Sequence, residues 1–184
     1  IYNSLLIKKR RQIHAEVGRA IEMIYQDRLE EFYEALAHHY SIGGVNEKGY
    51  HYLKLSGNKA IQKHSLWEAL GFFRRAIDKL NKMPEKPEKI RKQIEIIKLA
   101  EMSMRLLGYP EDSYDILQAG EELSKKLNNA QDIAIFSGII GLYHAQKGNP
   151  SKAKIYLDNC LGHIENIKEI KIIASIVFDI CVSY

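Results

Sequence analysis

The feature that most constrains the fold of this chain is a helix-hairpin pattern that occurs three times. The first copy carries Gly57, Ala69, Phe73 and Ala76, and Pro84 follows it. The second copy has small and large apolar residues at the same offsets: Gly141, Gly148, Ala153, Leu157 and Cys160. A weaker copy lies between them, with Gly108, Ser113, Leu117 and Gly120. Small residues recur where two helices approach closely, and stacked hairpins of this kind form an α-solenoid.

Helical periodicity extends along the whole chain, and no segment alternates with a period of two between hairpin turns. We therefore expect an all-α protein without a sheet. The expected helices span residues 4–25, 27–42, 46–63, 66–82, 87–107, 110–127, 130–147 and 150–165, and a ninth begins near Ile167. Ser65, with Glu68 three residues later, has the spacing of a capping box at the start of the fourth helix. Pro110 and Pro150 suit the first turn of a helix, where a missing N–H is harmless.

The expected organisation is a helical linker or first hairpin over residues 1–45, followed by repeats over residues 46–184. The repeats would occupy residues 46–84, 87–128 and 130–165, with a partial one over 167–184. The chain has no initiator Met and stops within an apolar helical pattern. We therefore expect it to be a piece of a longer protein.

Composition excludes several classes of protein. Hydrophobic residues make up 46% of the 184 residues, which is enough for a continuous core. The net charge of +4 is milder than the concentrated charge of a nucleic-acid binder. Cys160 and Cys181 form no close pair and no metal-ligand spacing, which is typical of a reducing cytosol. No signal peptide and no apolar run of about 20 residues occurs, so we expect a cytoplasmic protein without a membrane partner.

At the repeated positions the chain resembles the tetratricopeptide repeat family. Five residues of the first copy match its small-small-aromatic-small-Pro pattern: Gly57, Ala69, Phe73, Ala76 and Pro84. The chain departs from the family at Leu53 and Ala60, where Trp and Tyr are usual, and at Glu101, which takes the first Gly position of the middle copy. The resemblance implies a right-handed α-α superhelix, a TPR-like solenoid of antiparallel helix hairpins.

A second resemblance covers about the first 80 residues and depends on residues 10–40, RRQIHAEVGRAIEMIYQDRLEEFYEALAHHY. This stretch is similar to the segment that follows the ATPase module in large bacterial signalling proteins. Those proteins join a class III adenylate or guanylate cyclase domain, or a kinase domain, to a STAND-type ATPase and a C-terminal helical repeat array. The resemblance implies that the chain is the regulatory and interaction part of such a protein. No phosphate loop of the G-x-x-x-x-G-K-[ST] type occurs in it.

The tetratricopeptide resemblance also implies a binding groove, lined by the first helix of each hairpin. The groove positions of the first copy are His51, Lys54, Asn58 and Ile61; those of the middle copy are Glu95, Lys98, Met102 and Arg105; those of the last copy are Ile135, Gly138, Leu142 and Ala145. Lys54, Lys98 and Arg105 could hold an acidic peptide or a carboxylate. The apolar end could take a helix or a second copy of the array, and the alternative is a solvated groove.

Two further features have alternative interpretations. The basic run at residues 8–11, KKRR, is a solvated helix face, a contact with the upstream ATPase, or a nucleic-acid site. A nucleic-acid site would need other basic faces with interleaved aromatic residues.

His38 and His39 point about 100° apart on a helix, so they cannot share a metal as an i,i+4 pair does. We expect them to act in packing or capping, and the other histidines form no pair at i,i+3 or i,i+4.

The chain contains no recognisable catalytic set, so we expect no enzymatic activity, no cofactor and no metal. The expected function is protein–protein interaction or signal sensing within a multidomain regulator, with the upstream ATPase as one candidate partner. The alternatives are an effector-binding sensor module of a STAND-type transcriptional activator and a structural self-association array. An apolar stripe predicts a homodimer through the terminal helix: Ile167, Ile170, Ile173, Ala174, Val177 and Ile180.

Overall fold

The computed structural model describes residues 2–162, and side chains from residue 6 onward. Within that range the chain is all-α, as the periodicity predicts, and contains eight α-helices and one short 3-10 helix. The chain divides into two compact units, Ile1–Glu85 and Lys86–Tyr184. Each unit is described by itself.

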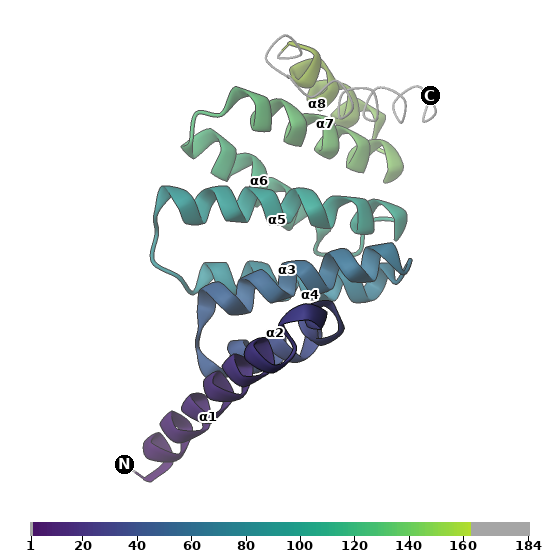
Figure 1. The fold of residues 1–184 in the computed structure, drawn as a ribbon. Coiled ribbons are helices and arrows are strands. Elements are labelled where there is room, and N and C mark those ends of the chain that lie inside the picture. Colours follow the sequence, from purple (N-terminus) through teal and green to yellow (C-terminus); the bar gives the residue numbers. More distant parts are fainter. Residues whose placement is uncertain (1, 163–184) are drawn as a thin grey trace. The chain divides into compact units, whose positions relative to one another are not determined.

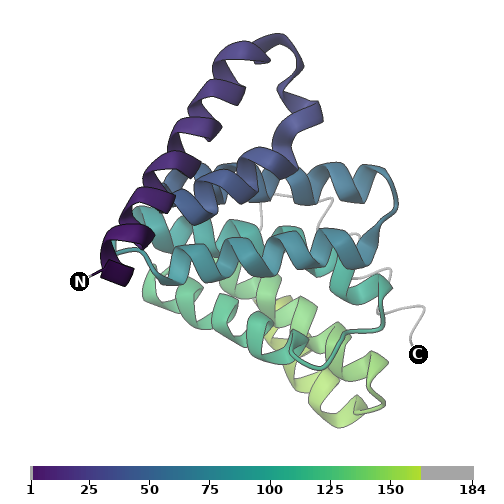
Figure 2. The ribbon, with the colours of Figure 1, turned by 90° about the horizontal axis from the view of Figure 1, so that it is seen from below.

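Unit 1 contains α1 (Tyr2–Ile24), the 3-10 helix η1 (Gln26–Phe32), α2 (Tyr33–Gly43), α3 (Asn46–Gln62) and α4 (Leu66–Asn81). Each α-helix packs against the next one along the chain (Figure 1). Figure 2 shows α1 and α2 as a hairpin closed by η1.

Unit 2 contains α5 (Pro87–Leu106), α6 (Ser113–Lys126), α7 (Ala130–Gln146) and α8 (Pro150–Gly162). Its helices also pack in chain order. The predicted ninth helix, its apolar stripe from Ile167 to Ile180 and Cys181 lie outside the described residues. None of the helices in residues 2–162 is both long enough and apolar enough to cross a membrane.

The predicted helix over residues 27–42 is wrong in its first part. Residues Gln26–Phe32 form a 3-10 helix, and Arg28 has a non-helical φ of −137° and ψ of 27°. In a 3-10 helix residues three apart lie over one another. Arg28 Nε accordingly donates a hydrogen bond to Glu31 Oε1 at 2.7 Å. The rings of Tyr25 and Phe32 stack across the same segment with their centroids 4.1 Å apart, so local side-chain contacts favour the tighter turn.

Two expected helix starts also differ from the prediction. Ser65 is the N-cap of α4, but its side chain makes no capping hydrogen bond, so the predicted capping box does not form. Pro110 precedes α6 because the chain first turns through Gly108 and Tyr109, which have φ of 74° and 53°. The N–H of Ser113 then donates to the carbonyl of Pro110 at 2.9 Å, and α6 begins at that residue.

Small residues mark the closest helix contacts. A Cβ added at Gly57 would lie 2.4 Å from Phe73 Cε1, and one added at Gly141 would lie 2.7 Å from Leu157 Cδ2. Each side chain can approach only because the facing residue has no Cβ. A third contact of this kind lies between α6 and α7, where a Cβ at Gly120 would lie 2.4 Å from the ring of Phe136. The other small or aromatic residues of the pattern are buried: Ala69, Phe73, Ala76 and Ala153.

Candidate functional site

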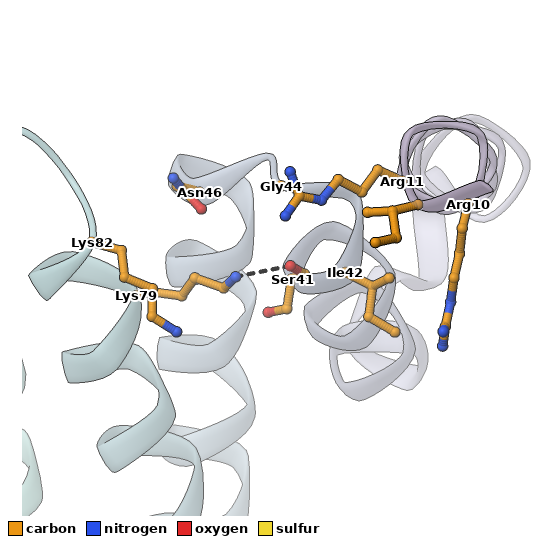
Figure 3. A pocket seen from close by; sticks show the side chains of 9 residues that line it. Arg10, Arg11, Ser41, Ile42, Gly44, Asn46, Lys79 and Lys82 are labelled. Carbon is orange, nitrogen blue, oxygen red and sulfur yellow. Dashed lines mark hydrogen bonds between the residues drawn. The ribbon is translucent and has the colours of Figure 1, made fainter. Parts of the chain in front are cut away.

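A hollow of about 620 Å³ opens in unit 1 between α1, the α2–α3 connection and the end of α4, and we call it the basic hollow. Four cationic side chains line it: Arg10 and Arg11 from α1, and Lys79 and Lys82 from the end of α4. The remaining lining residues are Ile7, Ser41, Ile42, Gly44 and Asn46. The lining therefore holds four positive groups and no acidic or aromatic side chain. Figure 3 shows that these residues come from α1, the α2–α3 connection and the end of α4, which are far apart in the sequence.

A close approach between α1 and α2 positions the first two cations. A Cβ added at Gly43 would lie 2.9 Å from the backbone nitrogen of Ala15. Gly43 is therefore the residue that lets the end of α2 lie directly against α1. Arg11 precedes Ala15 by one helical turn, so its side chain extends from the same face of α1 toward Gly44 (Figure 3).

Lys79 is the anchored cation of the basic hollow. Its Nζ donates a hydrogen bond to the carbonyl oxygen of Ser41 at 2.8 Å, in the last turn of α2 (Figure 3). The carbonyl end of a helix carries partial negative charge and favours a cation there. Burial lowers the pKa of Lys79, and the positive charges of Lys82, Arg75 and Arg11 lower it further. The Lys79 ammonium group is thus partly desolvated among other cations.

No carboxylate neutralises this charge within the part of the chain whose side chains are described. The side chains of Arg10, Arg11 and Lys82 make no hydrogen bond or ion pair with residues 6–162, and the partner of the Lys79 ammonium group is a carbonyl. Cations elsewhere in the chain do find acidic partners, as Lys98 does with Asp132 at 2.8 Å. A group of cations without counter-charges is suited to receive an anion, because charge-assisted hydrogen bonds are the strongest that side chains form.

The three cations that the repeat pattern predicted in a binding groove, Lys54, Lys98 and Arg105, make contacts within their own units. In unit 2, Lys98 Nζ lies 2.8 Å from Asp132 Oδ1, and Arg105 Nε lies 3.1 Å from Glu101 Oε1. In unit 1, Lys54 Nζ lies 5.8 Å from the centroid of the Tyr50 ring. Lys98 and Arg105 therefore already contact carboxylates of this chain, which the sequence pattern did not indicate.

The other predicted groove residues lie on the same helices. His51 and Asn58 are on α3, and the ring of His51 contacts that of Tyr52 with centroids 5.0 Å apart. Glu95 and Met102 are exposed on α5, whereas Leu142 on α7 is buried, with 7% of its surface exposed. A role for these residues in binding a partner stays a prediction.

The structure brings His14 next to the adjacent pair His38 and His39, which lie 24 and 25 positions further along the chain. His14 of α1 lies against His38 and His39 of α2, with ring centroids 5.7 Å and 5.0 Å away. The Nδ1 atoms of His14 and His39 are 3.1 Å apart, so one ring donates a hydrogen bond to the other. No group of three His, Cys, Asp or Glu side chains in the described residues is arranged to hold a metal ion. Only the packing of α1 on α2 could reveal this cluster.

We expect the stability of unit 1 to fall as the pH is lowered below about 6.5, the usual pKa of an unfolded histidine. Burial, and then the positive charges of His14 and His38, lower the pKa of His39 in the folded state. Between that lowered pKa and about 6.5 the unfolded chain binds more protons, so acidification favours unfolding. Urea midpoints at neutral and mildly acidic pH measure this loss. His39→Gln should reduce the pH dependence, and an unchanged slope would contradict this role of His39.

Glu22 is the centre of a network that joins α1, α2 and α3. Its Oε2 accepts a hydrogen bond from Tyr40 Oη at 2.5 Å and also contacts Lys48 Nζ, while its Oε1 accepts from Tyr52 Oη at 2.7 Å. Burial opposes ionisation of Glu22, but the hydrogen bonds from Lys48, Tyr40 and Tyr52 outweigh it and lower its pKa. Burial and the carboxylate of Glu22 raise the pKa of both tyrosines. The network supports the α1–α2 hairpin that carries the basic hollow.

Unit 2 has an aromatic cluster of its own. The rings of Tyr114, Tyr143 and Tyr156 lie around His144, with centroids 5.2 to 5.5 Å from it. Burial lowers the pKa of His144, and Lys152 adds to that effect. Burial and a hydrogen bond with Tyr114 raise the pKa of Tyr156 to about 12. These ring contacts join α6, α7 and α8.

No family model matches this chain, and no curated protein or solved structure matches it either. The tetratricopeptide and STAND-type resemblances therefore stay predictions. The basic hollow is the candidate functional site because it combines a concave surface with cations that no side chain of residues 6–162 neutralises.

Proposed function

We propose that the chain is a non-catalytic helical-repeat module for protein–protein interaction, and that its basic hollow binds an acidic segment of a protein partner. The observation that carries the proposal is the group of four cations in one hollow without a carboxylate to neutralise them. The Gly57–Phe73 and Gly141–Leu157 contacts support TPR-like helix hairpins, which in this proposal stack into a right-handed superhelix. Arrays of this kind present extended surfaces to partners.

The composition of the hollow favours a protein partner over a nucleic acid. Single-stranded nucleic acids stack their bases on aromatic side chains, and no aromatic residue lines the hollow. Duplexes need a stripe of cations along the phosphate backbone, whereas these four cations gather around about 620 Å³. A hollow of that size has room for the side chains of a short peptide segment.

The resemblance of residues 10–40 to the segment after a STAND-type ATPase gives this module a place in a larger protein. In this proposal the chain is the regulatory part of a cytoplasmic signalling protein with a cyclase or kinase output domain. Arg10 and Arg11 belong to the resembling stretch, so an acidic segment of the ATPase module is the leading candidate partner. Such a contact would be intramolecular and would therefore benefit from a high effective concentration.

The proposal predicts that charge reversal in the hollow weakens binding of an acidic peptide. A fluorescein-labelled hexaglutamate peptide is the probe, and fluorescence anisotropy in about 0.1 M salt measures its affinity. We expect Arg11→Glu/Lys82→Glu to weaken binding by at least about tenfold, because two attractive contacts become repulsive.

The matched control is Arg91→Glu/Lys154→Glu, which changes two exposed residues of unit 2 and alters the net charge equally. This control should bind the peptide almost as tightly as the parent chain does. Equal weakening in both double variants would show a response to net charge alone and would refute a site in the hollow.

A further inference from the structure

We propose that the basic hollow recognises a phosphate monoester, carried on a phosphorylated serine or threonine of the partner segment. This inference depends on the proposed function, because it names the group that the acidic segment presents. It follows from the positive charge of the hollow, from the hydrogen-bond donors that its cations offer and from the start of α3 beside it.

The first argument concerns the balance of charge. Four cations line the hollow, and Lys79 is further affected by the nearby charge of Arg75. A single carboxylate would neutralise one of these charges, whereas a phosphate monoester brings about −1.5 to −2 at neutral pH. Burial is the main cause of the lowered pKa of Lys79, and the positive charges of Lys82, Arg75 and Arg11 lower it further, so these like charges lie close enough to repel one another. A dianion would therefore relieve more repulsion than a monoanion.

The second argument concerns hydrogen-bond donors. Each arginine presents a planar fork that matches two oxygens of a phosphate, and Arg10 and Arg11 have no partner among residues 6–162. The ammonium group of Lys79 has three N–H donors, and one of them is used on the carbonyl of Ser41. Two fixed donors thus remain on the anchored cation. A phosphate has three oxygens to accept from these groups, while a carboxylate has two.

A third observation comes from the start of α3. Asn46, its first residue, lines the hollow, and the N-cap residue Val45 makes no side-chain capping hydrogen bond. The N–H groups in the first turn of a helix have no acceptor within the helix and favour an anion nearby. This helix end adds positive potential to the four side chains.

Inorganic phosphate and nucleotides share this chemistry, so the experiment must separate them from a phosphorylated peptide. No aromatic ring lines the hollow to stack a base, which disfavours a nucleotide. The two apolar lining residues, Ile7 and Ile42, give contact surface to the rest of a peptide. We therefore favour the phosphorylated segment over the free ions.

The test uses the whole chain and three acetylated pentapeptides, Glu-Glu-X-Glu-Glu, in which X is serine, glutamate or phosphoserine. Calorimetry at about pH 7.5, above the second phosphate pKa of about 6, measures their affinities. We expect the phosphoserine peptide to bind at least about tenfold more tightly than the glutamate peptide. Arg11→Gln should remove most of this preference, while Arg91→Gln should retain it. Circular dichroism checks that both variants fold, and Lys82→Gln is a second hollow variant.

The first of three outcomes separates the two proposals, and the other two overturn both. Equal binding of the phosphoserine and glutamate peptides, lost in Arg11→Gln, would support the acidic-segment function and overturn phosphate recognition. Binding of inorganic phosphate or adenosine monophosphate at the hollow, without binding of any pentapeptide, would overturn both proposals in favour of a free-ligand site. Failure of every probe to bind would also overturn both.

Discussion

Phe73→Ala is expected to lower the free energy of unfolding of unit 1 by about 3–5 kcal/mol. The ring of Phe73 is fully buried on α4 and lies directly against Gly57 of α3. Truncation removes this burial and leaves a cavity between two helices. Domains are typically stable by only about 5–15 kcal/mol, so the loss is a large fraction of the total. Urea denaturation, followed by far-UV circular dichroism and by the single tryptophan, Trp67 of α4, measures it.

The control for this prediction is Phe72→Ala, the same change at the neighbouring position. Phe72 is only half-buried, so its truncation should have a clearly smaller effect. Gly57→Ala provides a second check, because its Cβ would lie 2.4 Å from the ring of Phe73. This substitution should destabilise the parent by about 1–3 kcal/mol and should be less harmful in the Phe73→Ala background. Independent effects of the two substitutions would contradict the contact.

Glu22→Ala should lower the free energy of unfolding of unit 1 by roughly 2–4 kcal/mol, because it breaks a partly buried network. Tyr40 and Tyr52 are 0% and 5% exposed, and both hydroxyls donate to the Glu22 carboxylate. Without this acceptor, two buried donors and the Lys48 ammonium group lose their partner. Urea denaturation at neutral pH measures the change.

Two further variants serve as controls for Glu22→Ala. Glu16→Ala changes an exposed carboxylate on the same helix and should alter the free energy of unfolding by less than about 0.5 kcal/mol. Glu22→Gln keeps one acceptor oxygen, so its effect on the free energy of unfolding should lie between those of Glu16→Ala and Glu22→Ala.

The lowered pKa of Glu22 also makes its contribution to stability depend on pH. Its stabilisation is present above the unfolded pKa, about 4.3, and is lost as the pH falls through the lowered folded pKa, so acid should abolish the difference between Glu22→Ala and the parent.

Local chemistry predicts most of the helices well. The pattern over residues 46–63 corresponds to α3 at Asn46–Gln62, and that over 87–107 corresponds to α5 at Pro87–Leu106. Apolar periodicity, glycines and prolines act within a few residues, so they can be interpreted without the fold. The 3-10 segment Gln26–Phe32 is the exception, because competing side-chain contacts decided between two closely related helical forms.

The sequence pattern singled out two of the four cations of the candidate site, Arg10 and Arg11, but neither the two lysines nor their assembly into one hollow. The KKRR run at residues 8–11 could be a solvated face or a contact site, and nothing near it in the chain distinguished these interpretations. The packing of unit 1 brings Arg10 and Arg11 to one hollow with Lys79 and Lys82. The repeat pattern predicted that Lys98 and Arg105 line an open groove. In the structure both side chains pair with carboxylates of unit 2, so their charges are already neutralised.

Local sequence patterns thus suffice to predict a series of amphipathic helices with small residues at their contacts. They do not predict which cations share a hollow, which are neutralised and which histidines meet, because the interactions involved act over different distances along the chain. Helix formation depends on neighbours three or four residues away, whereas the basic hollow depends on how closely α2 approaches α1 at Gly43 and Ala15, and on where the end of α4 lies. Those distances depend on the packing of whole helices, which no local pattern specifies.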